Sequence, residues 1–175
     1  MDVTWILVPG GTCRYGDDGR PVGIAPLYWS ATPVAGDSGH PLTGLNREEA
    51  AAAARAFGGR LPKSAEWEWM AAGPDRRLYP WGDQPWRPEL ANLRESKLAQ
   101  PGPVGAHPAG ATPLGLLDVA GNVWEWTAST IMGGGAIIRG GSFASPPLYA
   151  QCTFLNAAPT ELRSRGIGFR VVREA

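Results

Sequence analysis

The side chains best suited to chemistry are few in this sequence. Its two cysteines, Cys13 and Cys152, lie far apart along the chain, as do its two histidines, His40 and His107. Paired thiolates bind soft ions such as Cu(I), and histidine clusters bind iron or zinc, so each kind of site needs partners that the neighbouring sequence does not supply. We expect both cysteines to be small, half-buried apolar fillers and both histidines to be solvated loop residues.

Patterns for nucleophilic or phosphate chemistry are also missing from the sequence. Ser142 and Ser145 lie near Arg139, but no histidine stands nearby to activate them. The glycine run at 133–135 precedes an expected strand rather than a helix, so it does not have the form of a phosphate-binding loop. No G-x-S-x-G elbow occurs. These observations favour a protein without catalytic activity.

Composition narrows the class of protein further. A chain of 175 residues suits one domain, expected over 1–175, and its 16 basic and 16 acidic residues leave no nucleic-acid footprint. The first residues, MDVTWILVPGG, lack the form of a secretory signal, and no membrane-spanning stretch occurs, so we expect a cytoplasmic protein. Its 24 glycines and 17 prolines predict many loops, while eight tryptophans predict a packed core.

Two segments carry the signals of helices. In NREEAAAAARAFGG, Asn46 is a good N-cap, Glu49 completes a capping box, and Gly58 offers a left-handed stop. In KSAEWEWMAAG, we expect Ser64 to cap the helix and Gly73 to end it.

The other elements are expected to be short. Residues 3–8 (VTWILV) are predicted as a first strand, and residues 136–139 and 168–173 as two closing strands. Turn signals predict short strands and loops over 12–45, and mostly irregular structure over 74–113.

Six blocks of sequence together carry a resemblance to a known family. They are ILVPGGTCRYG (6–16), GGRLPKSAEWEWMAAG (58–73), YPWGD (79–83), GLLDVAGNVWEW (115–126), RGGSF (139–143) and GFRVVR (168–173). In this order and spacing they resemble the formylglycine-generating enzyme, or sulfatase-modifying factor, family. The resemblance implies an α+β, C-type-lectin-like fold with two helices, short antiparallel strands and much irregular loop.

The resemblance also implies residues for catalysis, and these can be checked. The formylglycine-generating oxidases resemble thiolate copper sites, with two cysteines soon after the RGGSF block; the matching positions here hold Ser145 and Ala150. The iron-dependent relatives need a histidine cluster, which two histidines do not supply. A degenerate or active copper-dependent cysteine oxidase stays open as the alternative function.

One loop of the family resembles a calcium site, and calcium is the one cofactor to which this sequence points. Carboxylate and carbonyl oxygens would hold the ion, from Asp118, Gly121, Val123 and Glu125. In the alternative interpretation, Glu125 forms a structural ion pair with Arg139 or Arg170 beneath the tryptophans. Either role is architectural.

The irregular segment 144–166 resembles the variable region of the proteins diversified by retroelements, which share the RGGSF…GFR bracket. In those proteins, adenines of chosen codons are scrambled, which never yields Lys, Met, Trp, Gln or Glu. The segment lacks Lys, Met and Trp, whereas Gln151 and Glu161 would be fixed by the template. The variable, ligand-contacting positions would be Ala144, Ser145, Leu148, Tyr149, Phe154, Asn156, Ala157, Ala158, Leu162, Ser164, Arg165 and Gly166.

This resemblance predicts a ligand-binding display protein. A rigid scaffold with an irregular, exposed segment is the usual arrangement for binding, and Leu148, Tyr149 and Phe154 among small neighbours would serve as anchors. The ligand is expected to be a protein or another macromolecule whose identity the residues do not specify. The alternative is an ordinary surface loop in a relative of the oxidases that has lost catalysis.

Overall fold

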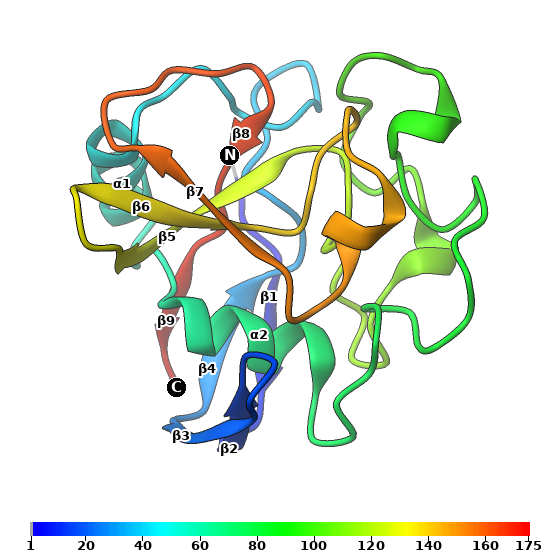
Figure 1. Ribbon diagram of the computed structural model, residues 1–175. Helices are drawn as coiled ribbons and strands as arrows, with labels where there is room; N and C mark the ends of the chain where they lie inside the picture. The colour runs from blue at the N-terminus through cyan, green and yellow to red at the C-terminus, as the bar shows by residue number, and fades with distance from the viewer. Residues whose placement is uncertain (1) are drawn as a thin grey trace.

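Three sheets organise residues 2–175, which are the residues that the computed structural model of the protein describes (Figure 1). The first sheet has three strands in the spatial order β1 (Trp5–Val8), β4 (Leu27–Ser30) and β9 (Val172–Glu174). The second is a hairpin of β2 (Gly11–Tyr15) and β3 (Arg20–Ile24). The third has four strands in the order β7 (Leu155–Pro159), β6 (Gly135–Arg139), β5 (Trp124–Thr130) and β8 (Ile167–Gly168). The strands pair antiparallel, except that β5 and β8 are parallel.

The first helix, α1 (Arg47–Ala56), begins as its sequence predicts. The Asn46 side chain accepts a hydrogen bond from the Glu49 N–H at 2.9 Å, and the Glu49 carboxylate accepts one from the Asn46 N–H at 3.0 Å. This reciprocal capping box satisfies two N–H groups that the helix leaves without partners. Gly58 adopts a φ of +86° just beyond the helix, which accords with the expected left-handed stop.

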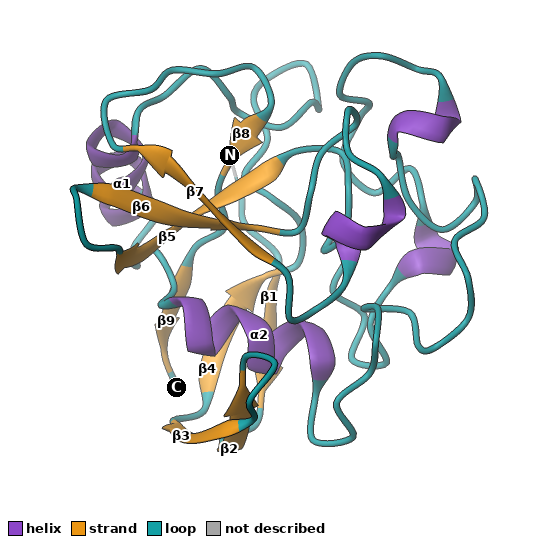
Figure 2. Ribbon diagram, in the orientation of Figure 1, coloured by secondary structure: helices purple, strands orange, loops and turns teal. Residues whose placement is uncertain are grey.

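The second helix, α2 (Ser64–Ala72), lies between the four-stranded sheet and the β2–β3 hairpin (Figure 2). The sequence predicts Ser64 as the N-cap of this helix, and that prediction is wrong. Lys63 is the N-cap, and Ser64 is the first helical residue. The Lys63 N–H donates to the Glu66 carboxylate at 2.7 Å, and this bond caps the end in place of a serine hydroxyl. The helix ends at Gly73, as expected. Elements pack against it on several sides, so nearly all of its residues are buried.

The predicted strand over 168–173 is wrong as a single element. The chain makes the short strand β8 beside β5, leaves that sheet, and then enters the other sheet as β9 beside β4. Between the two strands, the carbonyls of Phe169 and Val171 accept hydrogen bonds from the N–H groups of Val34 and Ser30. The last strands therefore tie the two larger sheets together, and the Arg170 side chain turns into the interior between them.

The core consists of large aromatic side chains with small residues between them. Trp29, Trp67 and Trp126 are fully buried. Trp29 and Trp67 belong to an apolar cluster that includes residues of α2, and Trp126 belongs to a second cluster with residues of α1, β5 and β6. Residues 74–113 are mostly irregular, as predicted, with two short 3₁₀ helices at Arg94–Ser96 and Pro108–Gly110. Among residues 2–175, no helix has both the length and the apolar character needed to cross a membrane.

Candidate functional site

The segment 144–166 starts where the chain leaves β6 in a tight turn. Gly140 and Gly141 have φ angles of +98° and +73°, a region that favours glycine, and a Cβ on Gly140 would lie 2.6 Å from the Val119 carbonyl oxygen. Next, the Ser145 hydroxyl accepts a hydrogen bond from the Ser142 N–H at 2.9 Å. A 3₁₀ turn, η3 (Pro147–Ala150), follows, and β7 then returns along β6 (Figure 1). The segment is thus held at both ends by the sheet that it leaves.

Most of the twelve predicted contact positions have side chains that reach solvent. Five of them are exposed: Ala144, Leu148, Asn156, Leu162 and Arg165. Another five are half-buried: Tyr149, Phe154, Ala157, Ser164 and Gly166. The remaining two are buried: Ser145 and Ala158. We call the ten exposed and half-buried residues the display face.

Ser145 and Ala158 do not fit the expectation of an outward contact surface. Ser145 is 4% exposed; its hydroxyl accepts from Ser142, and its carbonyl accepts from the Arg94 N–H at 2.9 Å. Ala158 pairs with Ala136 across the sheet and packs into the core. Asn156 lies two residues before Ala158, on the same face of β7, and is exposed, so the burial of Ala158 comes from the core residues that pack against it and not from the alternation of the strand.

Two half-buried residues of the display face, Tyr149 and Phe154, pack on the core and, with Trp124, support the rest of the face. The Tyr149 and Phe154 rings stack with their centroids 4.3 Å apart. Both also lie tilted against Trp124, at 5.9 Å and 6.3 Å. This stack joins η3 and β7 to the sheet, while Leu148 stays 53% exposed at the tip of η3. The face therefore has a rigid aromatic base and an exposed aliphatic anchor.

A shallow concavity of about 410 Å³ lies beside this aromatic base. Asn156, Leu162 and Arg165 contribute to its lining, together with Phe143. The Arg165 guanidinium lies 5.3 Å from the centroid of the Phe143 ring and donates to the Ala99 carbonyl at 3.4 Å. Both apolar and cationic groups are therefore available to a ligand at this place.

Glu125 is committed to an ion pair, which is the alternative that the sequence left open. Its carboxylate accepts from Arg170 Nε at 2.9 and 3.1 Å and from Trp67 Nε1 at 2.7 Å. Burial raises the pKa of Glu125, and the neighbouring Arg170 guanidinium opposes that rise. Arg170 also donates to the carbonyls of Ser30, Ala31 and Leu117.

The predicted calcium ligands do not form a fitting site around this ion pair. The Asp118 carboxylate accepts the Gly105 N–H at 2.6 Å, and Glu125 has no oxygen free of Arg170 and Trp67. Gly121 and Val123 belong to the buried backbone nearby, where Gly121 donates to the Gly140 carbonyl. Over residues 2–175, no group of three or more His, Cys, Asp or Glu side chains is placed to hold a metal.

Arg139 has a different partner from the one that the sequence considered. It pairs with Glu68 at 2.8 Å, and its guanidinium lies 5.0 Å from the centroid of the Trp67 ring. The same guanidinium donates to the Cys152 carbonyl and to the Ser64 hydroxyl. Sequence reasoning missed Glu68, although an acidic residue between two tryptophans of a helix is a signal of a buried, paired carboxylate.

The two cysteines are more deeply buried than predicted. Cys13 Sγ lies 3.9 Å from a Glu68 carboxylate oxygen, and Cys152 is fully inaccessible to solvent. Burial raises the pKa of Cys13 to about 11 and that of Cys152 to about 12, so both remain thiols at neutral pH. Ser145 and Ala150, which stand where the resemblance expects cysteines, are buried too. These residues do not fit a thiolate copper site.

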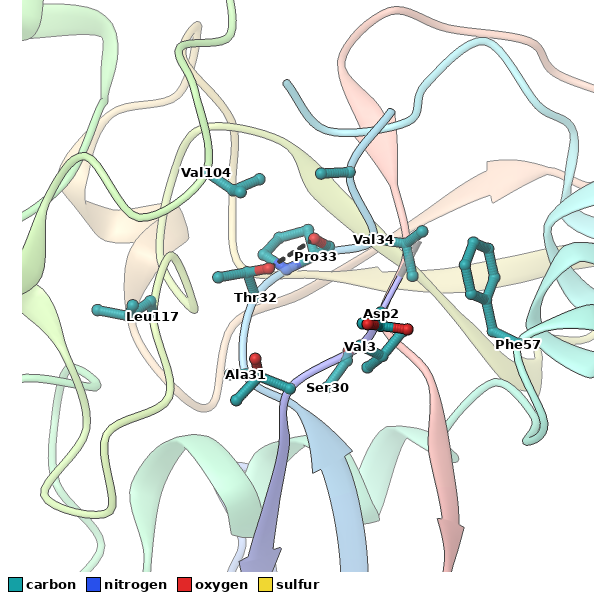
Figure 3. Close-up of a pocket in the computed structure, with 12 residues that line it drawn as sticks. Asp2, Val3, Ser30, Ala31, Thr32, Pro33, Val34, Phe57, Val104 and Leu117 are labelled. Atoms are coloured by element: carbon teal, nitrogen blue, oxygen red, sulfur yellow. Dashed lines mark hydrogen bonds between the residues drawn. The ribbon is translucent and has the colours of Figure 1, made fainter. Parts of the chain in front are cut away.

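The histidines do not form a site either. His40 is exposed, and His107 is half-buried in the irregular region. A separate cavity of about 360 Å³ has Asp2, Thr32 and Phe57 in its lining (Figure 3). Among its described lining residues, Asp2 supplies the one titratable side chain, and the Thr32 hydroxyl donates to the Pro33 carbonyl at 2.9 Å. This cavity lacks a paired nucleophile and base.

The arrangement of sheets, helices and long loops defines an α+β protein of the C-type-lectin-like class. The chain belongs to the family of the sulfatase-modifying factor enzyme 1-like domain, whose model matches residues 20–175. The predicted family is thereby confirmed, and five of the six sequence blocks lie within the matched residues, while the block at 6–16 precedes them.

Two curated enzymes and one solved structure show what the chain is similar to. The chain is 40% identical over 119 residues to a hercynine oxygenase of Mycolicibacterium thermoresistibile, covering 61% of this chain and 26% of that protein. It is 37% identical over 135 residues to the formylglycine-generating enzyme of Mycobacterium tuberculosis, covering 71% and 42%. The solved structure of Treponema denticola variable protein 1 superposes with a TM-score of 0.83 at 15% identity, covering 100% and 96%. The chain thus spans less than half the length of the hercynine oxygenase and of the formylglycine-generating enzyme. The likeness to the solved structure shows a shared fold.

Proposed function

We propose that this protein is a non-catalytic ligand-binding protein of the retroelement-diversified kind, whose display face contacts the ligand. The observation that carries the proposal is the exposure of the face on a rigid base. Leu148 and Leu162 are 53% and 40% exposed, whereas the Tyr149–Phe154 stack beneath fixes the backbone that presents them.

The display face has the properties that tolerance of substitution requires. Leu148, Asn156 and Leu162 are exposed, and Arg165 makes one long hydrogen bond and one contact with an aromatic ring. Substitutions at such surface positions change the free energy of unfolding by about 0.5 kcal/mol or less. The residues that hold the segment, such as Ser142 and Arg139, lie outside it and are buried.

The shape of the face favours a macromolecular ligand, and a protein in particular. Its concavity is shallow and open, whereas small molecules are usually held in enclosed pockets. Aromatic and aliphatic anchors surrounded by small residues are typical of the centre of a protein–protein interface. Arg165 at the rim would contribute orientation more than affinity.

A binding experiment tests the role of the face. We would screen the protein against an array of surface proteins, glycans and nucleotides, and then compare Leu148→Asp with Leu114→Asp. Leu114 is the matched control, because it is 50% exposed and lies outside the segment. Loss of binding in Leu148→Asp alone supports the proposal. If both variants bind a ligand of the wild-type protein as tightly as the wild-type protein does, the proposed role of the display face is contradicted.

The DNA around the gene tests the retroelement part separately. A near-copy of the stretch coding for 144–166, differing at adenines, should lie beside a reverse transcriptase gene. Absence of both would remove diversification from the proposal, while the binding experiment would still test ligand display.

The alternative function is that of a cysteine oxidase, because the sequence relatives include enzymes. At 37–40% identity, a hercynine oxygenase and a formylglycine-generating enzyme favour a cysteine-oxidising or related activity. The test is copper-dependent turnover of a cysteine-containing peptide. We expect none, because Ser145 and Ala150 offer no thiolates and both native cysteines are buried. Turnover that is lost on Cys152→Ala would favour the enzyme.

A further inference from the structure

A second concavity, of about 200 Å³, lies where the β2–β3 hairpin meets the C-terminal end of α2. Three arginines line it: Arg14 from β2, and Arg76 and Arg77 from the loop after α2. Thr153, from the segment 144–166, completes the lining on the side of that segment. We call this concavity the arginine pocket.

The arginines of this pocket lack carboxylate partners. Among residues 2–175, no acidic oxygen lies within 4.0 Å of the guanidinium nitrogens of Arg14, Arg76 or Arg77. Arg76 donates to the Gly16 carbonyl at 2.9 Å, and Arg77 donates to the Ala71 carbonyl at 2.9 Å. These bonds position the two guanidinium groups without neutralising their charge.

One of these guanidinium groups has an unmet hydrogen bond. Arg77 Nε is buried and has no hydrogen-bond partner within the described part of the chain. Burial lowers the pKa of Arg77, because the charged form is partly removed from water. Because that Nε atom is closed to solvent, an anion in the pocket would meet the outer nitrogens of the guanidinium, whose planar fork matches the geometry of an oxyanion.

The acidic and dipolar groups near the pocket do not cancel this charge. Glu68 is in the lining, but its carboxylate is engaged by Arg139 and by the Gly16 N–H at 2.9 Å. Cys152 and then Asp75 oppose the fall in the pKa of Arg77 that burial causes, and Asp75 does so without forming an ion pair with Arg77. Cys13 remains a neutral thiol, because burial raises its pKa to about 11.

The C-terminal end of α2 opposes an anion, since its carbonyls carry partial negative charge. That opposition is reduced here because several of those carbonyls already accept hydrogen bonds. The Ala71 carbonyl accepts from the Arg77 side chain, and the Ala72 carbonyl accepts from the Arg77 N–H at 2.9 Å.

We propose that the arginine pocket binds a small oxyanion of the phosphate or sulfate type, with Arg77 as its main ligand. Arg76 and Arg14 supply further positive charge, and the Thr153 hydroxyl supplies a neutral donor. The group is either a free ion or the terminal group of a larger molecule, and the small volume admits little beyond the oxyanion itself. The proposal for this pocket does not depend on the proposed role of the display face.

Binding at this pocket would also affect the segment that carries the display face. Thr153 follows Cys152, whose carbonyl accepts from Arg139 and whose N–H donates to the Leu78 carbonyl at 2.8 Å. An oxyanion held between Thr153 and Arg77 would add a bond between the base of the segment and the loop after α2.

Titration calorimetry and thermal unfolding at constant ionic strength test the proposal. Inorganic phosphate, inorganic sulfate and acetate are the probes, and chloride sets the ionic strength. We expect phosphate or sulfate to bind and to raise the unfolding temperature, while acetate binds more weakly because it has fewer acceptor oxygens. A phosphomonoester such as glycerol phosphate distinguishes a free ion from a carried group by its fit.

Variants locate the binding. Arg77→Gln should raise the dissociation constant at least about ten-fold, because it removes a charge-assisted bond, and Thr153→Val should raise it a few-fold. Arg87→Gln is the control, an exposed arginine outside the pocket that should bind like the wild-type protein. If Arg77→Gln does not fold, Arg76→Gln and Thr153→Val decide. A response equal in all anions, or one unchanged in these variants, would overturn the proposal.

Discussion

Replacing Glu125 by glutamine tests how the interior beneath the display face is held together. The side chain is 1% exposed, and its carboxylate accepts bonds from Arg170 Nε and Trp67 Nε1. Glutamine keeps the shape of the side chain but removes the charge, and its NH₂ group then faces two donors. One oxygen remains, which can accept one of the two bonds.

The expected loss follows from leaving Arg170 without a counter-charge. Breaking a buried ion pair on one side costs about 3–5 kcal/mol of the free energy of unfolding. Arg170 still donates to the carbonyls of Ser30, Ala31 and Leu117, which favours the lower end, about 3 kcal/mol. For a chain of this length, that corresponds to a fall of about 6–12 °C in the unfolding temperature.

Urea unfolding followed by tryptophan fluorescence measures this loss. The matched control is Glu48→Gln, because Glu48 is exposed and pairs with Arg47 at 2.8 Å on the surface; it should cost less than about 1 kcal/mol. A loss below about 1 kcal/mol for Glu125→Gln would refute the reasoning. So would a wild-type protein that EDTA destabilises while the Glu125→Gln variant is insensitive, since Glu125 would then hold a metal.

Three further changes test other parts of the structure. Asn46→Ala should lower the free energy of unfolding by about 1 kcal/mol in urea, because the Glu49 N–H loses its cap; no change would mean that the capping box adds nothing. Gly140→Ala should lower the free energy of unfolding, measured by calorimetry, by about 1–3 kcal/mol, since a Cβ at a φ of +98° would lie 2.6 Å from a carbonyl oxygen. The control Gly133→Ala, at a φ of +97° in open space, should lower it by less. Burial raises the pKa of Cys152 from 9.0 to about 12, so the stabilising contribution of this thiol is complete below pH 9 and is lost as pH rises toward 12. Cys152→Ala should therefore flatten that part of the profile of unfolding free energy against pH. An unchanged profile would contradict a buried thiol at this position.

The family and the site residues point to different conclusions about activity. The chain belongs to a family with enzyme members, and the positions that the resemblance assigns to the copper thiolates hold Ser145 and Ala150. In the structure, the Ser145 hydroxyl accepts from a backbone N–H, and Ala150 is packed in an apolar cluster. These two residues serve the turn and the core, and neither supplies a thiolate.

Much of the local structure was readable from the residues. The capping box of α1, the stop at Gly73 and the irregular region over 74–113 depend on interactions between near neighbours in the chain, and the sequence predicted each of them. The motif blocks likewise identified the family and its α+β fold before any contact was known. Local interactions can be predicted because the residues involved are always close together.

Tertiary contacts decided the rest. The partners of Arg139 and Arg170, the burial of Ser145 and the division of 168–173 into β8 and β9 all depend on residues distant in the chain. The arginine pocket likewise joins β2, the loop after α2 and Thr153, which no local pattern connects. A buried charge takes whichever opposite charge the packing brings within reach, so its partner is specified only when the whole core has formed.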